Sequence, residues 1–272
     1  MKKPGKVPEP PRSLGDDDKA GIRAALEGLR KSPGFKSRGA QNAMIAIAAR
    51  ALGASGGGAV IEAPTGVGKS LGYLTAGVPI ALARKRPLVI ATATVSLQEQ
   101  LVQRDIPRFL ADTGLQATVA IAKGRQRYAC LRNLAESAGG DTGESLFDFD
   151  PAYTRAPSVE EAKVIKALAQ GFDGGHWNGD LDIAPVPLPD GLRSRITTSA
   201  GACTRANCAF VEACPYLKAR AGVKAADIVV ANHDLVLAAL GLPDSEEGDN
   251  PILPMPSRAL FVFDEGHHLP AK

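Results

Sequence analysis

The stretch IEAPTGVGKS at residues 61–70 constrains the fold of this chain more than any other feature. It has the pattern A-x4-G-K-S, in which glycines let backbone amides turn toward phosphate oxygens. The start of the following helix adds partial positive charge at the same place. The pattern needs a strand before it and a helix after it, and residues 58–63 and 69–84 have the composition for both. The stretch therefore predicts a phosphate-binding loop on a parallel sheet, with a glycine-rich turn that binds nothing as the plainer alternative.

Each residue of this loop has a predicted role. Lys69 can neutralise the β- and γ-phosphates, and Ser70 can ligate Mg²⁺. Ala63 stands where the general pattern has its first glycine. That glycine is the least demanding one, because Lys69 and the amides before it grip the phosphates. The predicted nucleotide-binding residues are Ala63, Pro64, Thr65, Gly66, Val67, Gly68, Lys69 and Ser70.

Apolar strands and helical segments alternate around the loop. The predicted strands are residues 58–63, 87–92 and 117–122, and the predicted helices between them are 69–84 and 95–111. The pattern resumes near residue 226 and closes with a strand at 259–263. Strands that are apolar throughout are typical of a parallel sheet covered by helices on both faces. The predicted fold class is therefore α/β.

The last predicted strand ends directly at the tetrad DEGH, residues 264–267. The carboxyl ends of parallel strands are where such sheets bind ligands. Asp264 can hold Mg²⁺ directly or through water, Glu265 can orient the attacking water, and His267 can sense the γ-phosphate. An ordinary polar strand end is the alternative, and the phosphate loop favours the catalytic interpretation. Three other histidines, His176, His233 and His268, are expected to have surface or packing roles.

The four cysteines lie between these two motifs, inside a segment that interrupts the alternation. Cys203, Cys208 and Cys214 form a C-x4-C-x5-C group, and Cys130 lies far upstream. Four thiolates suit a [4Fe–4S] cluster or a structural zinc ion. Zinc sites usually show paired C-x2–4-C knuckles, which are absent from this sequence, so the spacing favours iron–sulfur over zinc. Free buried thiols are the third possibility.

Basic residues gather around the cysteines. The formal net charge of +3 is too small to indicate a nucleic-acid partner by itself, so the distribution of charge must carry that hypothesis. Lys123, Arg125 and Arg127 precede Cys130, and further basic residues flank the other three cysteines. One metal centre would gather them into a positive surface suited to a nucleic-acid strand. Solvated basic loops are the alternative.

These features predict the following domain organisation. Residues 1–20 are expected to be a flexible tail, residues 21–124 and 225–272 a nucleotide-binding domain, and residues 125–224 an insertion of helices and loops. The basic N-terminus has no apolar segment behind it, and no long apolar stretch follows. We therefore expect a cytoplasmic, monomeric protein without a membrane span.

Taken together, the motifs resemble those of the iron–sulfur superfamily 2 DNA helicases of the DinG/XPD type, and most of all the bacterial DinG group. The resemblance covers about residues 35–272 and rests on six ordered segments: FKSRGAQNAM, APTGVGKS, ATATVSLQEQL, KGRQRYAC, ADIVVANHDLVL and DEGHHLP. It implies a RecA-like P-loop domain interrupted by an iron–sulfur insertion. Gln41 would read the adenine edge, and the implied DNA contacts are Thr92, Thr94, Ser96, Lys123, Arg125 and Arg127.

The resemblance also implies an activity: ATP-dependent unwinding with 5′-to-3′ movement along single-stranded DNA, or at junctions of single- and double-stranded DNA, in repair or replication. The implied cofactors are ATP, Mg²⁺ and a [4Fe–4S] cluster. Gly266 stands where many relatives have alanine. Members of this family continue with a second motor domain that supplies arginine fingers, so this chain alone is expected to bind ATP weakly and turn over little.

Two other functions stay open at this point. One is a non-catalytic, nucleic-acid-binding fragment that keeps the ATP loop. The other is a P-loop ATPase with a zinc module that acts on protein partners.

Overall fold

The computed structural model describes residues 13–54, 56–139, 156–242, 252–254 and 256–271. The chain divides into two compact units. The sheet unit comprises Met1–Ala122 and Val223–Lys272, and the insertion unit comprises Lys123–Gly222, two residues from the predicted bounds of 125–224 at each end. In the described parts of the chain, no helix has the length and apolar character needed to cross a membrane.

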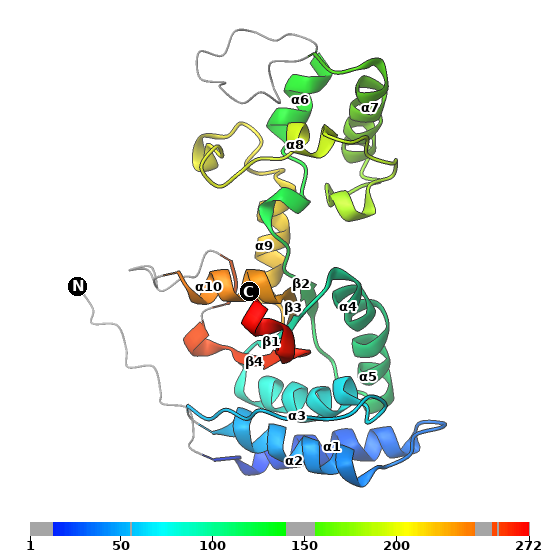
Figure 1. Cartoon of the computed structure of the whole chain (residues 1–272), viewed down its shortest axis with the longest axis vertical. Helices are drawn as coiled ribbons and strands as arrows, with labels where there is room; N and C mark the ends of the chain where they lie inside the picture. Colours follow the sequence, from blue (N-terminus) through cyan, green and yellow to red (C-terminus); the bar gives the residue numbers. More distant parts are fainter. Residues whose placement is uncertain (1–12, 55, 140–155, 243–251, 255, 272) are drawn as a thin grey trace, which may run out of the picture. The chain divides into compact units, whose positions relative to one another are not determined.

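A four-stranded, fully parallel sheet forms the centre of the sheet unit (Figure 1). Its strands are β1 (Leu88–Thr92), β2 (Val119–Ile121), β3 (Ile228–Asn232) and β4 (Leu260–Phe263). They pair in the order β2-β3-β1-β4, so β1 lies between β3 and β4. The predicted parallel α/β fold is confirmed. Because all strands run the same way, the residues that follow β1, β3 and β4 meet at one edge of the sheet.

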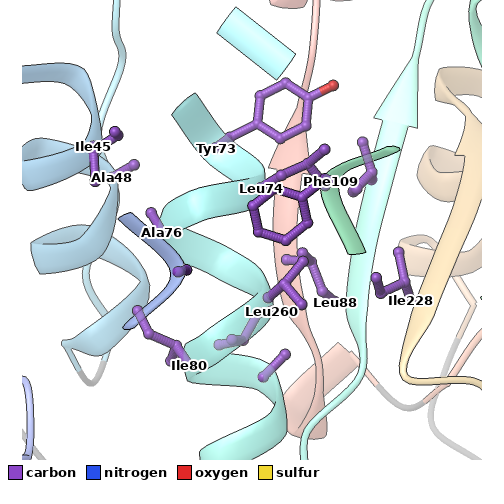
Figure 2. Close-up of a cluster of buried hydrophobic side chains, with 14 of the residues drawn as sticks. Ile45, Ala48, Tyr73, Leu74, Ala76, Ile80, Leu88, Phe109, Ile228 and Leu260 are labelled. Carbon is purple, nitrogen blue, oxygen red and sulfur yellow. The ribbon is translucent and has the colours of Figure 1, made fainter. Parts of the chain in front are cut away.

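Helices cover both faces of this sheet. Alternate strand residues point to opposite faces, so Leu88 and Ile90 belong to one apolar cluster and Val89 and Ala91 to another. The first cluster is covered by α1 (Asp16–Lys31), α2 (Gly39–Gly53), α3 (Lys69–Arg84) and α5 (Ile106–Thr113). Figure 2 shows side chains of this cluster from α2, α3, α5 and three strands. The helix α10 (His233–Leu240) packs into the second cluster through Val236 and Ala239.

One predicted strand is wrong. Residues 58–63 form no strand, and Val60 is fully exposed. They line one side of a groove of about 1140 Å³ whose other residues include Leu260–Phe263 of β4. A strand is stabilised by hydrogen bonds to a neighbouring strand, and none of the described strands pairs with this segment. The apolar composition of this segment was therefore not enough to make it a strand.

The predicted tail is also partly wrong, because α1 begins at Asp16 and residues 16–20 are helical. Three aspartates occupy the first turn of α1, where carboxylates interact favourably with the helix dipole. The carboxylate of Asp18 also accepts a hydrogen bond from the Gly15 amide at 2.8 Å. Residues 1–12 of the predicted tail lie outside the described residues.

The predicted helix at 95–111 is divided. It forms α4 (Val95–Gln100), a π-helical turn (Leu101–Asp105) and then α5. Proline is tolerated at the first positions of a helix, which is where Pro107 stands in α5.

The insertion unit has an apolar core of its own. This core joins α6 (Leu131–Gly139), α7 (Val159–Asp173) and α8 (Leu192–Ile196), and α9 (Pro215–Ala225) follows the last cysteine. A capping box starts α7, because Ser158 Oγ accepts from the Glu161 amide at 3.1 Å. The Glu161 carboxylate in turn accepts from the Ser158 amide at 2.6 Å. The reciprocal bonds fix the start of this helix.

Candidate functional site

The phosphate loop lies between residues 63 and 70, and its two glycines adopt left-handed backbone conformations. The φ angles are 83° at Gly66 and 86° at Gly68, a region that other residues rarely adopt. The buried side chain of Gln41 donates from Nε2 to the Gly68 carbonyl at 3.1 Å, and the Arg38 guanidinium donates to the Gly66 carbonyl. A Cβ atom at Gly68 would lie 2.4 Å from Gln41 Nε2. The loop therefore requires glycine here, and the predicted contact of Gln41 with adenine stays a prediction.

Lys69 and Glu265 meet at the end of the sheet, although they are far apart in the sequence. Lys69 begins α3, Glu265 follows β4, and the distance from Lys69 Nζ to Glu265 Oε1 is 2.7 Å. The hydrogen bond between them raises the pKa of Lys69 and lowers the pKa of Glu265, so both groups are charged at neutral pH. The structure thus brings together the two residues for which the sequence predicted phosphate binding and water activation.

Asp264 is held by polar contacts directly after β4. Its amide donates to the Ala91 carbonyl of β1 at 2.8 Å, and its Oδ2 accepts from Tyr73 Oη at 3.1 Å. Figure 2 shows the Tyr73 hydroxyl pointing away from the apolar cluster. Burial is the main cause that raises the pKa of Asp264 above its ordinary value. A cation next to this carboxylate would offset the energetic cost of burying its negative charge.

Asp264 and Ser70 have the chemistry that Mg²⁺ prefers. Magnesium in nucleotide sites is held by one or two protein oxygens, with phosphates and water completing its shell. Within the described ranges, no group of three or more His, Cys, Asp or Glu side chains could hold a metal ion. A nucleotide-bound ion needs only one or two protein oxygens, and the carboxylate of Asp264 and the hydroxyl of Ser70 are oxygens of this kind.

Glu265 has an unusual backbone conformation, with φ at 54°. A non-glycine residue in this region is uncommon and costs about 1–3 kcal/mol. His267 Nδ1 lies 3.4 Å from Glu265 Oε2, its side chain is mostly exposed, and its ring lies 4.1 Å from that of His268. His267 is therefore close to Glu265, one of the two strand-end carboxylates Asp264 and Glu265 that we call the carboxylate pair. Its role as a γ-phosphate sensor stays a prediction.

Two residues at this site were not predicted from the sequence. Tyr73 lies one helical turn after Lys69 and looked like one more apolar position of α3. His233 was expected to have a surface or packing role, and it is fully buried with its Nε2 2.8 Å from the Asp264 carbonyl oxygen. No local pattern predicts either contact, since both contacts join segments that lie far apart in the chain. His233 lies in the segment ADIVVANHDLVL, for which the sequence predicted no role of an individual residue.

The predicted DNA contacts near β1 differ in exposure. Thr92 is fully buried, and its hydroxyl donates to the Thr94 carbonyl at 3.1 Å. Thr94 and Ser96 are exposed, and Thr94 Oγ1 caps α4 by accepting from the Leu97 amide at 3.3 Å. Thr94 and Ser96 are therefore exposed residues at the carboxyl edge of the sheet, whereas the buried Thr92 supports the turn from inside.

All four cysteines are free, half-buried thiols that belong to the insertion unit. Burial raises the pKa of the Cys130 thiol, and Cys208 is close enough to contribute electrostatically. The Arg125 guanidinium donates to Cys203 Sγ at 3.1 Å. The structure does not draw three of these described thiols into one ligand group. The four predicted cluster ligands thus belong to one unit, and two of them, Cys130 and Cys208, lie close enough to interact.

The three predicted basic contacts in the insertion unit have acidic or aromatic partners. Lys123 pairs with Asp180 and Asp182, and Arg127 Nη2 lies 2.6 Å from Asp182 Oδ2. Burial acts to raise the pKa of Asp182, but Arg127 and Lys123 hold it below its ordinary value. Arg125 lies 4.1 Å from the centre of the Tyr216 ring. Lys123 and Arg127 therefore organise the insertion unit, and their charge is largely neutralised there.

A parallel α/β domain in which a loop of this pattern faces Asp264 and Glu265 at a strand end has the architecture of P-loop nucleotide-binding domains. The chain is homologous to the N-terminal portion of ATP-dependent DNA helicase DinG. It is 40% identical to the protein of that name from Salmonella typhimurium over 258 residues, which are 93% of this chain and 35% of the relative.

Two further relatives of the same name show similar coverage. The identity is 39% with the protein from Escherichia coli (strain K12), over 93% of this chain and 34% of the relative. It is 34% with the protein from Photobacterium profundum, over 93% of this chain and 36% of the relative. The chain thus spans about a third of the length of the curated relatives it matches. No protein-family model matches the chain.

Proposed function

We propose that the chain is the ATP-binding motor portion of an ATP-dependent DNA helicase that moves 5′-to-3′ along single-stranded DNA. The observation that carries the proposal is the 2.7 Å contact between Lys69 and Glu265, which joins the phosphate loop to the strand-end carboxylates. The homology to DinG over 93% of the chain supports the choice of DNA as substrate.

The residues of the site suggest how hydrolysis would proceed. In the structure, Lys69 and Glu265 neutralise each other. Phosphate oxygens arriving at the loop offer Lys69 a second partner, which frees Glu265 to accept a hydrogen bond from the attacking water. Asp264 and Ser70 would hold Mg²⁺, which supplies positive charge to the developing transition state.

The proposal assigns DNA binding to Thr94, Ser96 and Arg125, supported from within by Thr92, Lys123 and Arg127. Thr94 and Ser96 are exposed at the carboxyl edge of the sheet, where hydroxyls and amides can bind phosphates. Arg125 carries a charge without a carboxylate partner among the described ion pairs. Single-stranded DNA or a junction is the proposed ligand.

A salt titration tests DNA binding. The affinity of the chain for a labelled single strand, measured by fluorescence anisotropy, is expected to fall about tenfold between roughly 50 and 200 mM salt. The reason is that cationic side chains which bind DNA phosphates release the counterions condensed on the DNA, and added salt opposes this release. The Arg125→Ala protein should bind more weakly and with a shallower salt slope. The control is Arg108→Ala, which removes an exposed arginine from α5. Salt-independent binding, or equal effects of both substitutions, would contradict the assignment.

We further propose that Cys130, Cys203, Cys208 and Cys214 bind a [4Fe–4S] cluster. Supporting observations are the confinement of all four to one unit, the proximity of Cys130 to Cys208 and the positive charge of Arg125 at Cys203. Thiolates at one centre would tie together loops from both ends of the insertion unit, and metal ligation supplies folding free energy.

The free thiols also support a reducing compartment, and we propose a cytoplasmic monomer.

The metal content provides the test of this assignment. Protein purified without oxygen is expected to be brown and to contain about four irons and four sulfides per chain. Cys208→Ser should lose most of that iron, whereas the nucleotide site, which belongs to the other unit, should still bind ATP. Stoichiometric zinc without sulfide would instead establish a structural zinc module.

A further inference from the structure

His233 occupies an unusual place for a buried histidine. It is the first residue of α10, and its ring lies in the interior of the sheet unit with no exposed surface. Asn232 caps the helix directly before it, since Asn232 Oδ1 accepts from the Leu235 amide at 2.9 Å. The histidine is thus fixed at the carboxyl end of β3, at the same edge of the sheet as the residues that follow β4.

The ring makes its polar contact with the backbone of the carboxylate pair. His233 Nε2 lies 2.8 Å from the carbonyl oxygen of Asp264. A carbonyl oxygen can only accept, so Nε2 carries the proton and donates. Nδ1, the second ring nitrogen, is buried without a hydrogen-bond partner among the described residues. A histidine placed only to satisfy the core would be expected to use both nitrogens.

The Asp264 carbonyl belongs to the peptide group that joins Asp264 to Glu265. The carboxylate of Asp264 accepts from the amide of Glu265 at 3.0 Å, so both polar groups of this peptide are held. The orientation of the peptide relative to the Glu265 side chain is set by φ of Glu265, which is 54°. A strained angle persists only when neighbouring contacts hold it. The bond from His233 is one of those contacts.

We propose that His233 is a positioning residue of the nucleotide site, which fixes the peptide between Asp264 and Glu265. Through that peptide it aims the Asp264 carboxylate at the metal position and the Glu265 carboxylate at Lys69. Tyr73 holds the Asp264 carboxylate from α3, and His233 holds the backbone behind it from α10. This inference rests on the proposed function, because it assigns Mg²⁺-ATP to the same site.

The test compares ATP binding with Mg²⁺ and with EDTA, using a fluorescent ATP analogue and four proteins. These are the wild type, His233→Leu, His233→Asn and His233→Gln. The amide nitrogen of glutamine reaches about as far as Nε2 of histidine, whereas that of asparagine ends near the position of Nδ1. The two amide variants are therefore matched in polarity and differ in whether they can reach the Asp264 carbonyl. The melting temperature of each protein is recorded by circular dichroism.

In the wild type, Mg²⁺ is expected to tighten binding of the analogue. In His233→Leu and His233→Asn, the factor by which Mg²⁺ tightens binding should be about tenfold smaller. Without a hydrogen bond to its carbonyl, the peptide between Asp264 and Glu265 can turn away from the metal position. The binding of both variants in EDTA should stay within about twofold of the wild type, since Lys69 and the loop are untouched. His233→Gln should recover most of the Mg²⁺ effect.

Three results would overturn the inference. The first is an unchanged Mg²⁺ effect in His233→Asn. The second is an equal loss of affinity with and without Mg²⁺ that follows the loss of thermal stability, which would leave a structural role only. The third is a wild type that binds the analogue under neither condition, which would refute the proposed function and the inference with it. If His233→Leu does not fold, the comparison of the two amide variants decides the matter.

Discussion

Replacing Lys69 by alanine is expected to weaken binding of Mg²⁺-ATP by roughly tenfold to a hundredfold. Lys69 begins α3 behind the loop and is the cation that the phosphate oxygens would meet on displacing Glu265. A hydrogen bond to a charged group contributes about 1.5–3 kcal/mol, which corresponds to this range of affinity. The measurement is a titration of the purified protein with a fluorescent ATP analogue in the presence of Mg²⁺.

Lys31→Ala provides the matched control for this substitution. Lys31 is an exposed lysine in the last turn of α1 and has the same charge as Lys69. Its removal should leave ATP affinity within about twofold, because salt screens the effect of an exposed charge. A folded Lys69→Ala protein with the affinity of the wild type would mean that the loop does not bind nucleotide through this lysine.

Replacing Arg84 by alanine is expected to have the largest effect on stability. Arg84 Nη2 lies 2.6 Å from Asp18 Oδ2, Nε donates to Asp18 Oδ1 at 3.1 Å, and Nη1 donates to the Gly53 carbonyl at 3.0 Å. Both charged side chains are almost fully buried, with 9% and 4% of their surface exposed. Arg84 thus ties α1 and the end of α2 to α3. Removing one partner leaves a buried charge alone, which lowers the free energy of unfolding by about 3–5 kcal/mol.

Urea denaturation followed by circular dichroism measures this loss. The double variant Asp18→Leu with Arg84→Met should recover much of it, because apolar side chains can replace a buried ion pair without leaving an isolated charge. A change below about 0.5 kcal/mol in Arg84→Ala would contradict this expectation, since it would place the pair among ordinary surface contacts.

The same ion pair predicts a dependence of stability on pH. Burial alone would raise the pKa of Asp18, but hydrogen bonds from Arg84 and the Gly15 amide hold it below its ordinary value of 3.8. A carboxyl whose pKa is depressed by folding contributes stability above its unfolded pKa and loses it as the pH falls through the folded pKa. The wild type should therefore lose stability below about pH 4 more steeply than the double variant does.

The parts of the fold that could be predicted depend on local chemistry. Strands buried on both faces of a parallel sheet are apolar throughout, so residues 87–92 and 259–263 were recognisable as strands. The capping box at Ser158 and the loop before Lys69 are also local, because spacing along the chain fixes their geometry. The described elements contain both strands and the helix that begins after Ser158, whereas phosphate binding by the loop stays a prediction.

The parts that could not be predicted depend on distant partners. Residues 58–63 have the composition of a strand, but the composition does not reveal which strand would pair with them. Asp18 looked like part of a charged tail, because the arginine that buries it lies 66 residues further along the chain. The local sequence indicates which residues prefer a helix, a strand or a loop, but it does not show which distant residues pair with them.

The candidate site shows the same division. Lys69, Asp264 and Glu265 were identified because the chemistry of each follows from its motif. The contacts of Tyr73 and His233 with Asp264 join distant segments, so a motif could not reveal them, although His233 lies in the segment ADIVVANHDLVL. The basic residues of the insertion illustrate the opposite error. Clustered charge suggested an open surface, yet Lys123 is paired with carboxylates from a loop more than fifty residues away. Counting charges along the chain does not show which of them neutralise one another.

The most direct test of the central claim is a calorimetric titration of the wild-type chain with ATP, run in parallel with Mg²⁺ and with EDTA. We expect saturable binding of about one nucleotide per chain that is tighter with Mg²⁺, because Lys69 and Asp264 meet at one site. A chain that is folded by circular dichroism and shows no saturable binding of ATP at millimolar concentration would contradict the claim.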